Sequence, residues 1–418
     1  RKIKAIIDAD PARRFVVVSA CGRRSKADTK VTDLLYLVDA HVNYHVSCED
    51  LLTDIGQRYF DIADELNLDY PIRDEFAAFA ERARTGGYTT EELVSRGEYF
   101  TARLMAEYLG LPFIDAADMV AFHHDGTLSM KRTAELVKEN AREGGFVMPG
   151  FYGATKEGKI RLLDRGGGDI SGSILAQCLE ADLYENWTDV SGFLFADPHV
   201  VDNPQVMKTV TYRELRELSY MGATVIHEDA IFPVMQKKIP IRIKNTNAPD
   251  DTGTLILADT DEPAANTVTG IAGRKGFSSI NIEKYRIHDE CGAVRRMLEV
   301  LEEHGVNFEH IPSGIDNFSI VVETTSLADE TDDIVYDIKK VTSASSVTVE
   351  NGIALIAVVG RSMKSTRGVA GTIFSSLAKE NINIKMIDQG SSEINIVIAV
   401  AERDYERTIN TIYSAFVK

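Results

Sequence analysis

The C-terminal third of the chain contains an internal repeat, which constrains the fold more than any other feature. Val306–Gly314 resembles Ile382–Gly390, an offset of 76 residues, and the match continues without a gap from Phe318–Val322 to Ile394–Ile398. A helix-like stretch precedes each copy. The order helix, strand, turn and strand occurs twice and matches that of βαββαβ units. The sequence therefore predicts two ferredoxin-like units in tandem.

A different pattern precedes the repeat. Short apolar runs predict strands at 15–20, 146–150, 181–187 and 239–243, whereas 34–142 reads mostly as helices. Strands that alternate with helices predict βαβ units and a mainly parallel sheet with helices on both faces. An acidic segment near 258–268 with one proline is typical of a linker between domains.

Composition excludes several classes of protein. A net charge of −18 argues against a general nucleic-acid binder, and no apolar run is long enough to span a membrane. The four cysteines are widely scattered, which predicts neither a zinc site nor disulfides and fits a reducing cytoplasm. The chain begins with Arg1 rather than methionine, so we expect further residues to precede it.

A glycine-rich turn is the strongest local signal for chemistry. Arg165 precedes Gly166, Gly167 and Gly168, and Asp169 leads into a helix-like segment at 170–180. Glycines let backbone N–H groups approach an anion, and a helix N-terminus adds partial positive charge. A guanidinium can donate two hydrogen bonds to the oxygens of one carboxylate or phosphate. The pattern therefore favours a site for a phosphoryl group and a small acid, although an ordinary strand-to-helix turn has the same local sequence.

Five motifs occur together in the order and spacing of one family. They are 18–20 with 30–35, 93–98, 149–153, 165–169 and 187–192. On these motifs the N-terminal part resembles the amino-acid kinase fold, more narrowly the aspartate kinase family, and the repeat resembles its paired ACT regulatory domains. The resemblance implies a three-layer α/β kinase domain at 1–258, followed by ACT-like domains at 265–345 and 346–418.

The resemblance also implies the reaction. The γ-phosphoryl group of ATP would pass, with Mg²⁺, to the side-chain carboxylate of L-aspartate, giving 4-phospho-L-aspartate. Because a carboxylate must approach a polyphosphate, catalysis is chiefly positioning and charge neutralisation. Magnesium would be held by phosphates and water, so no metal-binding motif is expected. The polar segments 123–125 and 227–229 are interpreted as solvated positions.

Roles for individual residues follow from the resemblance. Arg165 is expected to bind a carboxylate of aspartate, and Asp169 its ammonium group or a water. Glu98, expected in a strand–helix turn after Gly97, would also bind the ammonium group. Ser19 and Thr32 offer hydroxyls, and Phe151 would cover the site. The substrate site would further include Gly166 and Gly167, and the nucleotide would contact Thr188, Asp189 and Asp197.

Structural roles would explain some of these residues equally well. Ser19 would end a strand, Thr32 would cap a helix, Phe151 would belong to the core, and Arg165 would pair with Asp169.

The chain also departs from the family pattern. The family's Lys-Phe-Gly-Gly motif, whose lysine contacts the phosphates, does not precede Ile3, so we expect the sequence as written to be poorly active. Gly168 stands where many members have serine. Thr224 and His199 stand where many have lysine and arginine, for which Lys237, Lys238, Arg242 or Lys244 would have to compensate.

The regulatory half implies an effector and a partner. Paired units of this kind join between chains, so a homodimer or larger homo-oligomer with lysine and/or threonine at the seam is expected. Acidic residues at this site favour lysine, although a solvated acidic turn explains them nearly as well. The expected effector residues are Asp289, Glu290, Gly292, Val294, Asn307, Phe308 and Glu309.

Two alternatives remain at this point. Glutamate 5-kinase shares the fold but predicts no tandem ACT-like repeat. A non-catalytic amino-acid-sensing subunit would explain the missing lysine motif.

Overall fold

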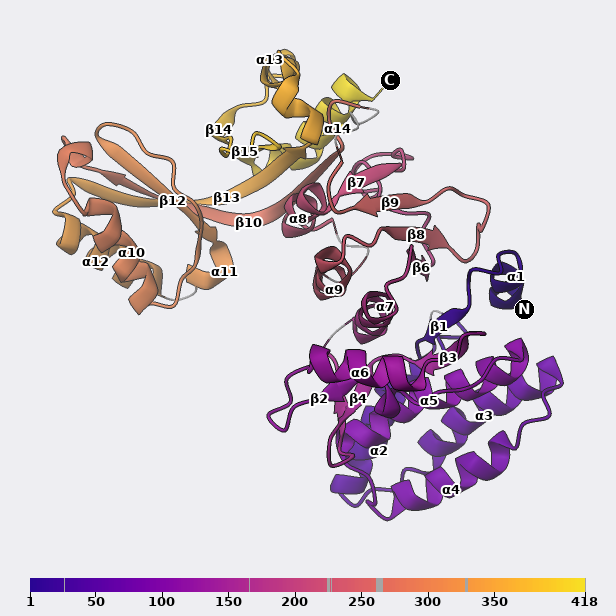
Figure 1. The fold of residues 1–418 in the computed structure, drawn as a ribbon. Coiled ribbons are helices and arrows are strands. Elements are labelled where there is room, and N and C mark those ends of the chain that lie inside the picture. Colours follow the sequence, from indigo (N-terminus) through magenta and orange to yellow (C-terminus); the bar gives the residue numbers. More distant parts are fainter. Residues whose placement is uncertain are drawn as a thin grey trace. The chain divides into compact units, whose positions relative to one another are not determined.

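The structure, a computed structural model, describes residues 1–25, 27–164, 166–223, 226, 228–260, 266–327 and 330–417. The chain divides into two compact units (Figure 1). The first comprises Arg1–Ser191 with Val225–Ala258, and the second comprises Gly192–Thr224 with Asp259–Lys418. The domain boundaries given above stay predictions. Within the described ranges, no helix combines the length and apolar character needed to cross a membrane.

The first unit alternates helices with short strands. Its elements are α1 (Lys2–Asp8), β1 (Phe15–Val18), α2 (Val31–Asn43), α3 (Glu49–Leu66), α4 (Ile72–Arg84), α5 (Thr90–Leu109), η1 (Ala116–Asp118), β2 (Ala121–Phe122), α6 (Met130–Asn140), β3 (Phe146–Pro149), β4 (Tyr152–Thr155), β5 (Ile160–Leu162), α7 (Gly167–Cys178), β6 (Tyr184–Thr188), η2 (Glu228–Ala230), α9 (Ile231–Gln236), β8 (Ile241–Asn245) and β9 (Thr254–Leu257). The four strands predicted from apolar runs are confirmed as β1, β3, β6 and β8.

Parallel pairs bring strand ends together in this unit. β1 pairs in parallel with β3, from Phe15 opposite Phe146 to Val18 opposite Pro149. β6 pairs in parallel with β8, and β2 with β4, while β4–β5 and β8–β9 are antiparallel. The predicted α/β class with parallel strands is therefore confirmed. β2 lies inside the stretch that was interpreted as mostly helical, because two residues are too few to show a strand period.

Helices α2 to α5 form one hydrophobic core beside these strands (Figure 1). Its centre is a cluster of aromatic rings from α3, α4 and α5, namely Tyr59, Phe76, Phe79 and Phe100. α5 also packs on β1 and β3, and α7 packs on β1. The ends of β1 and β3 are thereby fixed between two helices.

The second unit contains the repeat. Its elements are β7 (Thr209–Thr211), α8 (Tyr212–Tyr220), β10 (Gly270–Glu283), η3 (Ile287–Asp289), α10 (Ala293–Glu303), β11 (Phe308–His310), β12 (Asn317–Glu323), α11 (Thr324–Leu327), α12 (Thr331–Thr342), β13 (Ser346–Val359), η5 (Arg361–Ser365), α13 (Val369–Lys379), β14 (Ile384–Asp388), β15 (Asn395–Ala401), η6 (Glu402–Asp404) and α14 (Tyr405–Phe416).

One six-stranded sheet runs through both copies, in the order β11-β12-β10-β13-β15-β14. The long strands β10 and β13 pair with each other along their length, and each serves both copies. The C-terminal half of β10 pairs with β12, and the C-terminal half of β13 pairs with β15. Gly276 and Gly352, 76 residues apart, both have positive φ, of 92° and 74°, between these halves. The predicted repeat of helix, strand, turn and strand is confirmed, with one core under α10 and α12 and another under α13 and α14.

Candidate functional site

Three segments of the first unit converge where β1 and β3 end. Ser19 follows β1, and the N–H of Gly150, which follows β3, donates to the carbonyl of Val18 at 2.9 Å. A Cβ on Gly150 would lie 3.0 Å from Cα of Gly168, and a Cβ on Gly168 would lie 2.5 Å from Oγ of Ser19. Glycines therefore allow the start of α7 to approach the ends of both strands. Ligands of open parallel sheets bind at such strand ends.

The glycine-rich turn is the N-terminus of α7. Gly166 is the N-cap, with φ of 85° in the left-handed region that favours glycine, and the helix begins at Gly167, earlier than expected. The N–H groups of a first helical turn and the helix dipole make this end suited to an anion. Arg165 lies outside the described residues, so its contact with substrate and the alternative pairing with Asp169 stay predictions.

Asp169, in the first turn of α7, is held against β6. Nδ2 of Asn186 donates to its Oδ1 at 2.8 Å, and the Tyr184 hydroxyl donates to its main-chain carbonyl at 3.1 Å. Sequence reasoning missed both partners. Tyr184, Asn186 and Thr188 alternate along β6, so the strand period was a signal that could have placed them on one face.

Glu98 is a buried carboxylate of α5 that lies close in space to the end of β1. The expectation of a strand–helix turn is wrong, because the helix continues through Gly97. Its side chain is buried, Oε2 has no hydrogen-bond partner within the described part of the chain, and the backbone N–H of Ala20 donates to the carboxylate. Burial raises the pKa of Glu98 to about 7. A buried carboxylate with one unpartnered oxygen is suited to a cationic group.

Phe151 lies over the glycine turn. It has φ of 75°, rare for a residue other than glycine, and its N–H donates to Oγ of Ser171 at 2.8 Å. A Cβ on Gly167 would lie 2.4 Å from the Phe151 ring. The side chain also packs on the core of α2 to α5, so the covering role and the core role are compatible. An unusual backbone held in place in this way is typical of functional sites.

Thr32 is the second residue of α2 and is not its N-cap, which is Lys30. The segment that leads into α2 is held by a residue that sequence reasoning missed. The buried guanidinium of Arg58 donates to the carbonyl of Thr29 at 2.7 Å and to carboxylates of Asp28 and Asp54 at 2.9 Å each. No local motif marks Arg58, because its partners are up to 30 residues away.

The predicted nucleotide residues divide between the two units. Thr188 and Asp189 lie at the end of β6, where the Thr188 hydroxyl donates to Asp189 at 3.2 Å. Asp197 belongs to the second unit, where its carboxylate accepts from the N–H of His199 at 2.8 Å. Thr224 lies outside the described residues. Of the cations proposed to compensate, Lys237 is paired with Glu180 at 2.8 Å.

The predicted effector residues lie around α10 and β11. Asp289 pairs with Arg286 at 2.7 Å, and Glu290 pairs with Lys284 and Arg296, which lower its pKa. Gly292 caps α10 with φ of 80°, and Val294 lies in that helix. Asn307 precedes β11, the exposed Phe308 is its first residue, and Glu309 within the strand accepts from the Tyr220 hydroxyl. The acidic groups are thus already paired, and a cationic effector would have to displace their partners.

Comparison with known proteins agrees with this architecture. Residues 1–245 match the model of the amino acid kinase family, and 356–416 match that of an ACT domain. Aspartokinase 3 of Bacillus subtilis is 36% identical over 99% of this chain and 94% of its own length. The crystal structure of Clostridium acetobutylicum aspartate kinase has a TM-score of 0.92 at 47% identity, covering 99% of this chain and 96% of that one.

Escherichia coli aspartokinase III shares the fold at greater distance. Its structure with aspartate and ADP has a TM-score of 0.67 at 24% identity, covering 99% of this chain and 95% of that one. Its structure with lysine and aspartate has a TM-score of 0.71 at 23% identity, covering 100% and 96%. The chain therefore belongs to the amino acid kinase family and, within it, to the aspartate kinases.

Proposed function

We propose that the first unit transfers the γ-phosphoryl group of ATP to the side-chain carboxylate of L-aspartate beside the N-terminus of α7, giving 4-phospho-L-aspartate. The observation that carries this placement is the end of β1. Ser19 lies against Gly168 at the start of α7, and the next residue, Ala20, donates to the buried Glu98. One short segment thus joins an anion-binding helix end to a carboxylate suited to an ammonium group.

The residues then have separate tasks. The unpartnered Oε2 of Glu98 accepts from the ammonium group of aspartate, while Arg165 and the N–H groups of α7 bind its carboxylates and the phosphates. Asn186 orients Asp169, and Phe151 shields the site from water. Charge neutralisation and positioning supply most of the rate in phosphoryl transfer.

Magnesium fits this arrangement as a companion of the nucleotide. No cluster of three metal-ligating side chains occurs among the described residues, whereas Asp169 and Asp189 offer oxygen atoms near the helix and strand ends. When bound, Mg²⁺ supplies charge neutralisation on the phosphates. The structure of E. coli aspartokinase III with aspartate and ADP supports the choice of substrates.

We also propose lysine and/or threonine as effector and a homodimer or larger homo-oligomer as the assembly, with the effector at the α10–β11 residues named above. The lysine complex of E. coli aspartokinase III supports this proposal. Four free cysteines are consistent with a cytoplasmic location. The match to the kinase family over 1–245 favours the catalytic role over that of a sensing subunit.

The proposal is tested by trapping the acyl phosphate with hydroxylamine. The intact protein is expected to give hydroxamate with L-aspartate, ATP and magnesium together, and none when any one of them is omitted. L-glutamate is the matched control substrate. Hydroxamate from glutamate but not from aspartate would refute the substrate assignment.

The role of Arg165 has its own test. Arg165→Ala should raise the KM for aspartate and lower kcat/KM by roughly 100-fold, because it removes a charged donor from the site. Arg161→Ala is the matched control, since Arg161 pairs with Glu91 at 2.8 Å and not with the helix end. Unchanged kinetics in Arg165→Ala would remove this residue from the site.

A further inference from the structure

A polar hollow lies on the six-stranded sheet of the second unit. It has a volume of about 190 Å³, and the side chains that decide its chemistry are Ser279, Asn281, Ser319, Glu350, Lys385 and Met386. Ile280 and Ile282 of β10 point into the core under α10 and α12, so the alternating Ser279 and Asn281 face the opposite side. Ser279 lies between Val321 and Glu350, and Asn281 lies beside Ser319, on neighbouring strands.

The repeat gives this hollow a counterpart that the chain itself covers. At the offset of 76 residues, Ser319 corresponds to Asn395 and Lys385 corresponds to Glu309. Helix α8 packs on β10 and β13, where Glu217 accepts from Nδ2 of Asn395 at 2.6 Å and the Tyr220 hydroxyl donates to Glu309. One of two related surfaces is therefore filled by an internal helix, and the other is open.

The open surface presents charges of both signs. Lys385 pairs with Glu350 at its wall, and their side chains remain 24% and 49% exposed. A partly exposed ion pair contributes little by itself, so a ligand can separate the two charges and bind both. Ser279 and Ser319 each donate to Oδ1 of Asn281 at 2.8 Å, which orients the amide. Nδ2 of Asn281 makes no hydrogen bond to any residue that the structure describes.

We propose that this hollow binds a small zwitterion of the size of a free amino acid. Its carboxylate binds Lys385 and Nδ2 of Asn281, its ammonium group binds Glu350, and its side chain lies on Met386. The volume is below that of pockets for drug-sized ligands, which limits the occupant to a compact molecule. The site shares no residue with the predicted effector site, and the proposal does not depend on the phosphoryl-transfer reaction.

A methyl NMR titration tests the proposal directly. Met386 is 8% exposed and lines the hollow, whereas Met297 lies in the core under α10. With the full chain labelled at methionine methyl groups, Met386→Ile assigns the reporter signal. The probes are the common L-amino acids singly, with propionate and ethylamine as molecules that carry one charge. At least one amino acid should shift the Met386 signal saturably and leave Met297 unchanged, and the two single-charge probes should not shift it.

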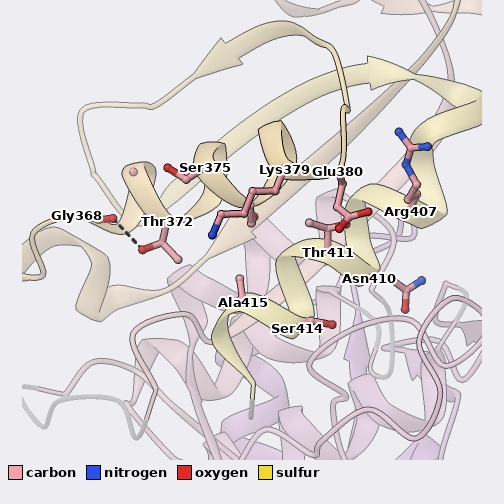
Figure 2. A pocket seen from close by; sticks show the side chains of 12 residues that line it. Gly368, Thr372, Ser375, Lys379, Glu380, Arg407, Asn410, Thr411, Ser414 and Ala415 are labelled. Carbon is pink, nitrogen blue, oxygen red and sulfur yellow. Dashed lines mark hydrogen bonds between the residues drawn. The ribbon is translucent and has the colours of Figure 1, made fainter.

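Variants show whether the named charges bind the ligand. Lys385→Met and Glu350→Gln should each weaken the titration about tenfold or more, since each removes a charged hydrogen-bond partner. Lys379→Met is the matched control. Lys379 belongs to a broader groove of about 900 Å³ between α13 and α14, lined mainly by small and hydroxyl side chains (Figure 2). Asp289→Asn controls for the predicted effector site.

Two results would overturn the proposal. One is that no probe moves the Met386 signal at millimolar concentration. The other is that the shift keeps its affinity in both Lys385→Met and Glu350→Gln, or is lost only in Asp289→Asn. Thermal unfolding of each variant separates loss of binding from loss of fold.

Discussion

At the scale of single residues, the burial of Glu98 destabilises its ionised form but suits it to binding a cationic group. Burial opposes its ionised form and raises its pKa from 4.5 to about 7, so near neutral pH the carboxylate is poised between two protonation states. An ammonium group beside Oε2 would favour the ionised form. Binding of such a group would therefore lower the pKa of Glu98.

The pKa of Glu98 predicts how stability varies with pH. Because the folded pKa lies above the unfolded value, this residue stabilises the fold below pH 4.5, and the contribution is lost as the pH rises through about 7. Glu98→Gln should therefore raise the free energy of unfolding at pH 8 by up to roughly 3 kcal/mol, with little change at pH 4.5. Urea denaturation at the two pH values measures this.

The same substitution should impair aspartate binding. A glutamine side chain carries no charge, so the KM for aspartate should rise in Glu98→Gln, and in the parent protein it should rise as the pH falls below about 7. Glu107→Gln, at an exposed position of the same helix, is the control. A Glu98→Gln enzyme with the parent's KM would show that another group binds the ammonium.

At the scale of elements, the approach of α7 to β1 depends on the absence of a side chain at one position. Ser19 Oγ occupies the space that a Cβ on Gly168 needs. A side chain at position 168 would therefore require β1 and α7 to move apart or Ser19 to change its rotamer. The close approach thus depends on the combination of Ser19 and Gly168.

A double-mutant cycle tests this pairing. Gly168→Ala should reduce stability by roughly 1–3 kcal/mol through overpacking, although alanine favours helix. Adding Ser19→Ala should recover most of the loss, because only the hydroxyl is in the way. Gly371→Ala in α13 meets no atom within 4 Å and should be neutral or stabilising. Additive effects of the two substitutions would contradict the contact.

At the scale of the whole molecule, the sequence predicted the repeat, four strands of the kinase unit and the glycine turn, because each has a local pattern. It did not predict that Glu98 lies within a helix, since Gly97 suggested a break. It also missed Arg58 and Asn186, whose partners are distant in sequence. That residues 192–224 cluster with the regulatory half was likewise hidden, because such contacts arise only when the chain has folded.

Glu214 joins this segment to the rest of the second unit. Its buried carboxylate accepts from Thr269 and from the N–H and guanidinium of Arg361, the last at 2.9 Å. Burial alone would raise its pKa, but these bonds and those from Thr211 outweigh burial and lower it. Arg361→Met should reduce the free energy of unfolding by roughly 3–5 kcal/mol, because it leaves a buried charge without its cation.

Denaturant unfolding, followed through a spectroscopic signal that comes from the second unit, measures this effect. Arg403→Met is the control, since the Arg403 side chain is 88% exposed. Equal stability of the two variants would show that Glu214 is neutralised in another way.

The pairing of the long strands β10 and β13 limits how the gene segment for the regulatory half can be divided. Each of these strands supplies part of both copies within the single sheet, so cutting the gene between the copies would remove a central strand from each copy. A single recombination at the end of the first copy would therefore not transfer a complete copy to another protein. A substitution on either strand therefore affects the packing of both copies.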